Sequence, residues 1–139
     1  MIARKQLEDS EFSFRLDLRS GVPVYRQLID QVQAAIATGV LKVGEQLPTV
    51  RRVAVDLAIN PNTVARAYRE MELLGVLDTQ QGTGTFVAER QVQPSKDERK
   101  RQLTQLVTEF VARAGTSGIK VEELVEALRQ VSSEARNKR

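Results

Sequence analysis

The sequence predicts a mainly helical α+β protein in which a domain over residues 1–90 precedes a small two-helix tail over residues 91–139. Apolar residues recur at three- and four-residue spacing in several segments, as they do on the buried faces of amphipathic helices. Two short apolar segments around a glycine-containing turn predict a β-hairpin before residue 90. The length of 139 residues suits one ordinary domain with an appendage.

The composition excludes several classes of function before any motif is considered. The chain contains no cysteine and no histidine, which rules out disulfide scaffolds, zinc fingers and catalysis by Ser-His-Asp or Cys-His groups. We therefore expect neither an enzyme nor a cofactor. The formal net charge of +3 belongs to the tail, because residues 1–90 hold 11 basic and 11 acidic residues.

The location of the protein is predicted from two further features. No segment approaches the roughly 18 apolar residues that a transmembrane helix needs. No apolar stretch follows Met1–Lys5, as it would in a secretory signal. We expect a cytoplasmic protein without a membrane partner.

The first predicted elements are a β-strand at about residues 12–18 and a helix after it. Polar residues alternate in the strand segment with four apolar ones, Phe12, Phe14, Leu16 and Leu18. The helix begins after Pro23 and ends at Gly39. Its apolar stripe consists of Tyr25, Leu28, Ile29, Val32 and Ile36.

Two more helices follow, with a tight turn between them. The first begins after Thr49, a favourable N-cap, and ends near Ala58. The second has Asn60 as its N-cap and Pro61 at its first position, where no amide hydrogen is needed, and Gly75 ends it. The two apolar faces comprise Val50, Val53, Ala54 and Leu57, and Val64, Ala67, Tyr68, Met71 and Leu74. Two short helices in this arrangement are typical of a helix-turn-helix.

The segments 76–79 and 85–87 are predicted to pair as short strands. Gly82 and Gly84 lie between them and supply the positive φ that a hairpin tip requires. Helices followed by such a hairpin, or wing, give the element order of a winged helix-turn-helix domain.

A polar linker after Ala88 leads into the two amphipathic helices of the tail, which are separated by a break at 115–118. A helical pair cannot bury both of its apolar stripes by itself, so the tail predicts self-association into a homodimer. The residues expected in that interface are Leu103, Leu106, Val107, Phe110, Leu124 and Leu128.

The helix after Asn60 fits the role of a DNA-recognition helix, which presents small polar and basic groups from its first turns. Asn62, Thr63 and Arg66 lie outside its apolar stripe, and Asn and Arg side chains form paired hydrogen bonds with adenine and guanine edges. Arg51 and Arg52 would reach phosphates where the preceding helix crosses the DNA backbone. Residues 48–69 hold four arginines and one acidic residue, so this surface is locally basic.

Structural roles compete with DNA contact at several of these positions. Asn60 is expected to cap its helix rather than to contact a base. Arg66 and Arg69 could each form an ion pair with an acid on a solvated helix face instead of binding DNA. For Arg66, DNA contact is the favoured interpretation. For Arg69, both interpretations stay open. The aromatic residues are expected in the core rather than in a stacking platform, namely Tyr25, Tyr68 and Phe86.

Taken together, these stretches resemble the DNA-binding domain of the GntR family of bacterial transcription regulators. The matching motifs are PVYRQL, GxLKxGEQLPTVRxxA, NPNTVxRAYxxME, and LLGVL followed by GTGTFV. The short two-helix tail is similar to that of the YtrA subfamily, whose members pair through it. The resemblance implies a homodimeric repressor that binds a palindromic operator in double-stranded DNA and often controls its own operon with a transporter. It also implies DNA contact by Arg51, Asn62 and Thr63, with Gly82 at the wing tip.

The predicted wing departs from the pattern of many relatives, which carry basic residues there. Its expected DNA-contacting residues are Gln81, Gly82 and Thr83. DNA contact by the wing would rest on backbone amides, the Gln81 amide and the Thr83 hydroxyl. Because these groups are uncharged, the wing should add little to the salt dependence of DNA binding.

Two alternatives stay open from the sequence. A winged helix can serve protein–protein assembly without a duplex partner, and the neutral charge of residues 1–90 and the uncharged wing favour that interpretation. Control by a small-molecule effector is also open, with a pocket between protomers or between domains. A histidine-ligated metal effector is excluded, because the chain has no histidine.

Overall fold

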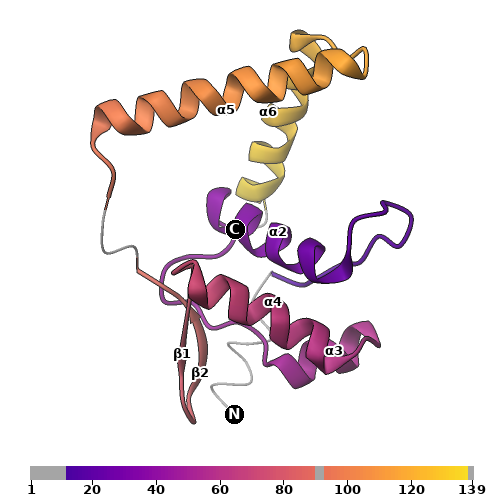
Figure 1. The fold of residues 1–139 in the computed structure, drawn as a ribbon, viewed down its shortest axis with the longest axis vertical. Helices are drawn as coiled ribbons and strands as arrows, with labels where there is room; N and C mark the ends of the chain where they lie inside the picture. The colour runs from indigo at the N-terminus through magenta and orange to yellow at the C-terminus, as the bar shows by residue number, and fades with distance from the viewer. Residues whose placement is uncertain (1–11, 90–92, 138–139) are drawn as a thin grey trace. The chain divides into compact units, whose positions relative to one another are not determined.

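A computed structural model of the chain describes residues 12–89 and 93–137, which fall into two compact units. The expected boundary between residues 90 and 91 lies outside the described residues. The first unit contains helices α2 (Val24–Ala37), α3 (Val50–Leu57) and α4 (Pro61–Leu73), followed by strands β1 (Leu77–Gln80) and β2 (Gly84–Val87) (Figure 1). The second contains α5 (Lys96–Thr116) and α6 (Val121–Asn137). The mainly helical winged helix-turn-helix fold expected from the sequence is confirmed.

The core of the first unit lies around α4, which packs against α2, α3 and β1. The predicted apolar stripes supply most of the buried side chains. Leu28 and Val32 of α2 and Val64, Ala67 and Met71 of α4 have no exposed surface. Leu74 differs from expectation and is 66% exposed, because α4 ends at Leu73 and Leu74 is already its C-cap.

Side-chain caps begin both helices of the helix-turn-helix, as predicted. The hydroxyl of Thr49 accepts a hydrogen bond from the Arg52 amide at 3.1 Å. The Oδ1 atom of Asn60 accepts one from the Asn62 amide at 2.9 Å. Between the two helices, Ala58 ends α3 in the left-handed conformation, with φ of 54°. The caps and this turn set where α4 begins.

The wing is the hairpin formed by β1 and β2, which pair in antiparallel register from Leu77↔Val87 to Gln80↔Gly84. The extended segment at 44–47 runs along the other edge of β2. Its Leu47 amide donates to the Thr85 carbonyl at 2.8 Å, and its Glu45 carbonyl accepts from the Val87 amide at 2.9 Å. The base of the wing is thus held to the chain that enters α3.

The strand predicted at residues 12–18 is wrong, because this segment forms no strand. Its backbone groups are bonded by glutamine side chains of α2 instead of by a neighbouring strand. The Gln27 amide accepts from the Asp17 amide and donates to the Asp17 carbonyl, both at 2.9 Å. Gln31 makes the equivalent pair of bonds with Arg15. The alternating pattern therefore marks an extended segment packed along a helix.

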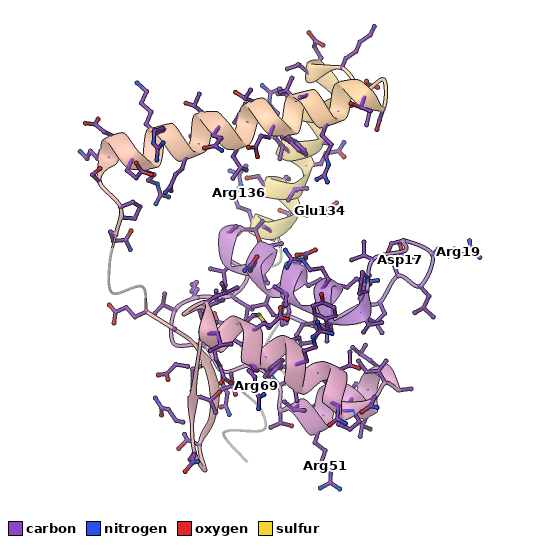
Figure 2. All side chains as sticks on the ribbon, in the orientation of Figure 1. Asp17, Arg19, Arg51, Arg69, Glu134 and Arg136 are labelled. Atoms are coloured by element: carbon purple, nitrogen blue, oxygen red, sulfur yellow. The ribbon has the colours of Figure 1, made fainter. Side chains whose placement is uncertain are left out.

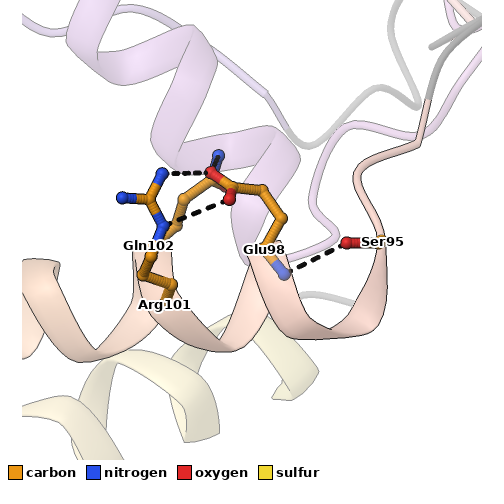
Figure 3. Close-up of polar contacts among 4 residues, drawn as sticks. All are labelled: Ser95, Glu98, Arg101 and Gln102. Carbon is orange, nitrogen blue, oxygen red and sulfur yellow. Dashed lines mark hydrogen bonds and ion pairs between the residues drawn. The ribbon is translucent and has the colours of Figure 1, made fainter.

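The second unit is a pair of helices joined by a short turn, and α5 begins with a well-formed cap (Figure 3). Ser95 Oγ accepts from the Glu98 amide at 3.2 Å, and the Glu98 carboxylate accepts from Arg101 at 2.8 and 3.1 Å. These bonds from Arg101, with one from Gln102, lower the pKa of Glu98. At the other end α5 continues through Gly115 and ends at Thr116, within the expected break at 115–118.

The start of α6 is satisfied by an acidic side chain rather than by a Ser or Asp cap. The backbone amide of Lys120 donates to the Glu123 carboxylate at 2.8 Å. Glu123, one of the acids in the first turn, therefore binds a free amide at the start of the helix, and acids at this end also complement the helix dipole. In the part of the chain that the structure describes, no helix combines the length and apolar character needed to cross a membrane.

Candidate nucleic-acid interface

The outward face of α4 carries the polar and basic residues expected of a recognition helix. Asn62, Arg66 and Arg69 are exposed, and Thr63 is half-buried. Three of these side chains and Ala65 line an open hollow on the helix surface. The opposite face of α4 is buried through Val64, Ala67, Tyr68 and Met71. The helix is thus oriented with its hydrogen-bonding groups toward solvent.

Arg66 is held by two neighbours rather than extended freely into solvent. Its guanidinium carbon lies 3.8 Å from the centre of the Tyr25 ring, which is a cation–π contact between α4 and α2. Its Nε atom lies 3.6 Å from a Glu70 carboxylate oxygen, and its side chain remains 60% exposed. The ion pair that was the alternative to DNA contact therefore exists, and it leaves the Arg66 side chain accessible.

The two arginines at the start of α3 have different environments. Arg52 Nε lies 3.7 Å from an Asp56 carboxylate oxygen one turn along the helix. Within residues 12–89 and 93–137, Arg51 has no ion-pair partner, and Figure 2 shows its side chain pointing away from the body of the unit. In that view Arg51, Arg69 and the wing tip lie toward the same side. Arg51 is the better placed of the two to bind a phosphate.

The wing tip is exposed and carries no charge. Gln81, Gly82 and Thr83 are all exposed, and Gly82 has φ of +77°. The tip is tied to the segment before α3, because the Gln46 side-chain amide donates to the Thr83 carbonyl at 3.2 Å. A cross-strand contact of 3.2 Å joins the hydroxyls of Thr79 and Thr85. The polar side chains at the tip are open to a ligand, whereas the Thr83 amide already donates to the Gln80 carbonyl at 3.0 Å.

Sequence reasoning missed two residues that shape this surface. Tyr25 packs against the core, as expected, but its half-buried ring also lies under Arg66, which was not predicted. Gln46 was not singled out, although it links the wing tip to the chain before α3. Neither partnership leaves a periodic signal, since each joins residues about 40 positions apart in the sequence.

The residues expected at a dimer interface belong to the second unit. Leu103, Leu106, Val107 and Phe110 of α5 are 63, 66, 51 and 45% exposed. On α6, Leu128 is 55% exposed and Leu124 is half-buried. The structure of one chain thus leaves a row of large apolar side chains open to solvent.

Comparison with known proteins gives a consistent assignment. The family model described as bacterial regulatory proteins, gntR family, matches residues 24–87, from the start of α2 to the end of β2. The HTH-type transcriptional repressor YtrA of Bacillus subtilis is 30% identical over 122 residues, which cover 88% of this chain and 94% of YtrA.

Two further relatives also span both units. An HTH-type transcriptional regulator of B. subtilis, YhcF, is 39% identical over 112 residues, covering 80% of this chain and 91% of YhcF. The solved structure of YtrA from Sulfolobus acidocaldarius, a GntR-family transcription factor, is 32% identical with a TM-score of 0.51, and the match covers 86% of this chain and 97% of that one. Because the similarity extends from the helix-turn-helix through the tail, the chain belongs to the GntR family of bacterial regulatory proteins.

Proposed function

We propose that the protein is a homodimeric, cytoplasmic repressor that binds a palindromic operator in double-stranded DNA. The observation that carries this proposal is the exposed face of α4, where Asn62, Arg66 and Arg69 line an open hollow while the opposite face is buried. A helix presented in this way fits the major groove, where Asn and Arg read adenine and guanine edges. The similarity to a protein named as a transcriptional repressor supports the direction of control.

The remaining polar residues around α4 are assigned to positioning on the duplex. Arg51 and Arg52 at the start of α3 would bind phosphates and set the register without reading sequence. Asn62, Thr63 and Arg66 would supply base contacts. The wing would contribute through the Gln81 amide, the Thr83 hydroxyl and the backbone of Gly82, and so would add little to the salt dependence of binding.

The exposed apolar stripes of the second unit support pairing of two chains. Leu103, Leu106, Val107 and Phe110 lie at helical spacing along α5, and each is nearly half exposed or more. Burying such side chains against a second copy removes apolar surface from water, which is the main driving force of stable association. A symmetric dimer would place two α4 helices in successive major grooves, with half-sites about 10 base pairs apart.

The experiment that tests the proposal selects binding sites from a pool of random-sequence DNA duplexes with the purified full-length protein. We expect enrichment of a palindrome with half-sites about one helical turn apart. Affinity for the enriched duplex should fall with rising salt on a log–log plot, because each neutralised phosphate releases counterions. A pool without enrichment would contradict the proposal.

Substitution of Arg51 tests how the domain is positioned. Arg51→Ala should weaken binding to enriched and scrambled duplexes alike and reduce the salt slope by about one. Arg19→Ala is the matched control, because it removes the same charge from a turn where Figure 2 shows the side chain pointing away from Arg51. Loss of affinity for the enriched duplex alone would contradict a phosphate-binding role for Arg51.

A second candidate function is protein–protein assembly without DNA. The uncharged wing tip favours it, because an anionic partner would select basic residues there. Under this alternative the protein should show neither a sequence preference nor a negative salt slope in the same experiment.

A further inference from the structure

We infer that Tyr25 is a positioning residue for sequence readout, because its ring and the Glu70 carboxylate together hold the Arg66 guanidinium in a fixed orientation on the exposed face of α4. This inference rests on the proposed DNA-binding function. It assigns a role in specificity to a residue of α2, outside the helix-turn-helix.

The geometry places the guanidinium between an aromatic face and a carboxylate. The guanidinium carbon of Arg66 is 3.8 Å from the centre of the Tyr25 ring, and its Nε atom is 3.6 Å from Glu70 Oε1. The Tyr25 ring is itself held in place, because Tyr25 is half-buried and α2, which carries the buried Leu28, packs on α4. Two neighbours therefore restrict a side chain that would otherwise have many rotamers.

The hydrogen-bonding edge of Arg66 remains available in this arrangement. Among the residues that the structure describes, neither terminal guanidinium nitrogen has a hydrogen-bond partner, and the side chain is 60% exposed. Two parallel N–H groups match the O6 and N7 acceptors of guanine. A guanidinium that is already oriented loses less conformational freedom when it binds than a mobile one does.

The paired carboxylate also determines what kind of contact Arg66 makes. Glu70 offsets the positive charge of Arg66, which reduces its attraction to phosphates at any sequence. The hydrogen-bond donors are unaffected by this neutralisation. The arrangement of Tyr25, Arg66 and Glu70 therefore favours discrimination between bases over general affinity for DNA.

The test uses the duplex enriched from the random pool by the wild-type protein, variants of it with each G·C pair replaced singly by A·T, and a scrambled duplex. Affinities are measured by fluorescence anisotropy for the full-length wild type, Tyr25→Leu, Tyr25→Phe, Arg66→Ala and the double variant Tyr25→Leu with Arg66→Ala. Circular dichroism melting confirms that each variant is folded.

We expect Tyr25→Leu to weaken binding to the enriched duplex about five- to tenfold and to lower discrimination at one G·C pair. The reason is that the Arg66 guanidinium loses its contact with an aromatic ring. Binding to the scrambled duplex should change less than about twofold. Tyr25→Phe retains the aromatic face and should behave as the wild type. In the Arg66→Ala background, Tyr25→Leu should have almost no effect, since the residue that it positions is absent.

Three results would overturn the inference: equal weakening on every duplex, a Phe variant as impaired as the Leu variant, or additive effects of Tyr25→Leu and Arg66→Ala. If Tyr25→Leu does not fold, the variant Glu70→Gln is used to test the inference. It should bind the scrambled duplex more tightly and discriminate less, and the opposite result contradicts the inference. Failure of the proposed function is distinct, because the wild-type protein itself would then enrich no sequence.

Discussion

The hydroxyl of Tyr68 on α4 donates a hydrogen bond to the carbonyl oxygen of Pro48, just before α3, at 2.5 Å. Tyr68 is 3% exposed, and burial raises the pKa of its hydroxyl well above the usual range. The bond ties the middle of the recognition helix to the connection that enters the helix before it. It thereby links the positions of the two helices of the helix-turn-helix.

Tyr68→Phe should destabilise the protein at neutral pH. The substitution removes the hydrogen bond and leaves the Pro48 carbonyl in a partly buried position, which costs about 1–2 kcal/mol of unfolding free energy. Urea unfolding followed by circular dichroism measures the change. Tyr25→Phe is the control, because Tyr25 is only half-buried, and a shift as large as that of Tyr68→Phe would contradict the role of the Pro48 bond.

The same substitution should change how stability depends on alkaline pH. An unfolded chain releases the tyrosine proton near pH 10, whereas the folded state keeps the proton on Tyr68 to higher pH. The stabilising effect of this group is therefore complete below about pH 10 and is lost as pH rises, by up to about 1.4 kcal/mol per pH unit. The difference between wild type and Tyr68→Phe should shrink between about pH 9 and 11. A constant or widening difference would count against a raised pKa.

Asn60 should contribute to stability as a helix cap. Its Oδ1 atom bonds the Asn62 amide at 2.9 Å, so Asn60→Ala should lower the unfolding free energy by about 1 kcal/mol. Asn60→Asp retains an acceptor at the N-terminus of α4 and should leave stability close to that of the wild type. Chemical denaturation of both variants checks the prediction. Equal destabilisation by the Ala and Asp substitutions would show that the side-chain cap does not contribute to the unfolding free energy.

Ala58→Gly should stabilise the protein. Ala58 has φ of 54° and ψ of 47°, a left-handed conformation that costs a residue with a Cβ about 1–2 kcal/mol. Glycine relieves this strain but makes the unfolded chain more flexible, which leaves a net gain of about 0.5–1 kcal/mol. Ala34→Gly in α2 is the control and should destabilise by about 1 kcal/mol, because it lies within regular helix. Thermal melts of the two variants should shift in opposite directions.

Gly84→Ala should disturb the wing more than Gly82→Ala does. Both glycines have positive φ, so an added side chain is strained at either position, at a cost of about 1 kcal/mol or more. A Cβ at Gly84 would in addition clash with the Gln46 amide nitrogen and displace the side chain that bonds Thr83, whereas a Cβ at Gly82 meets nothing within 4 Å. Combining Gly84→Ala with Gln46→Ala in a double-mutant cycle should recover part of the loss. Strict additivity would mean that the two residues do not interact.

Local chemistry explains which parts of this fold could be predicted from the sequence. Caps at Thr49 and Asn60 depend on residues two or three positions away, and the structure has both. The alternating residues at 12–18 could not reveal their partner, because pairing with Gln27 and Gln31 depends on how the chain returns along α2. The ring of Tyr25 under Arg66 likewise depends on the packing of α2 against α4. Sequence periodicity identified both helices as amphipathic but carried no information about which residues meet at their edges.

Leu106→Glu should convert the proposed dimer into monomers. Leu106 is 66% exposed in the single chain and lies in the apolar stripe of α5. Burying one leucine contributes about 1.5–3 kcal/mol, and a symmetric dimer loses this contribution twice, which raises the dissociation constant more than about 100-fold. Thr108→Glu is the matched control, because it adds the same charge to an exposed residue of α5 outside the stripe. Light scattering over a range of concentrations should report monomers for Leu106→Glu and dimers for Thr108→Glu. If both variants stay dimeric, the interface does not involve this stripe. The free energy of burying an unpaired carboxylate there would exceed the free energy that the apolar contact contributes to association.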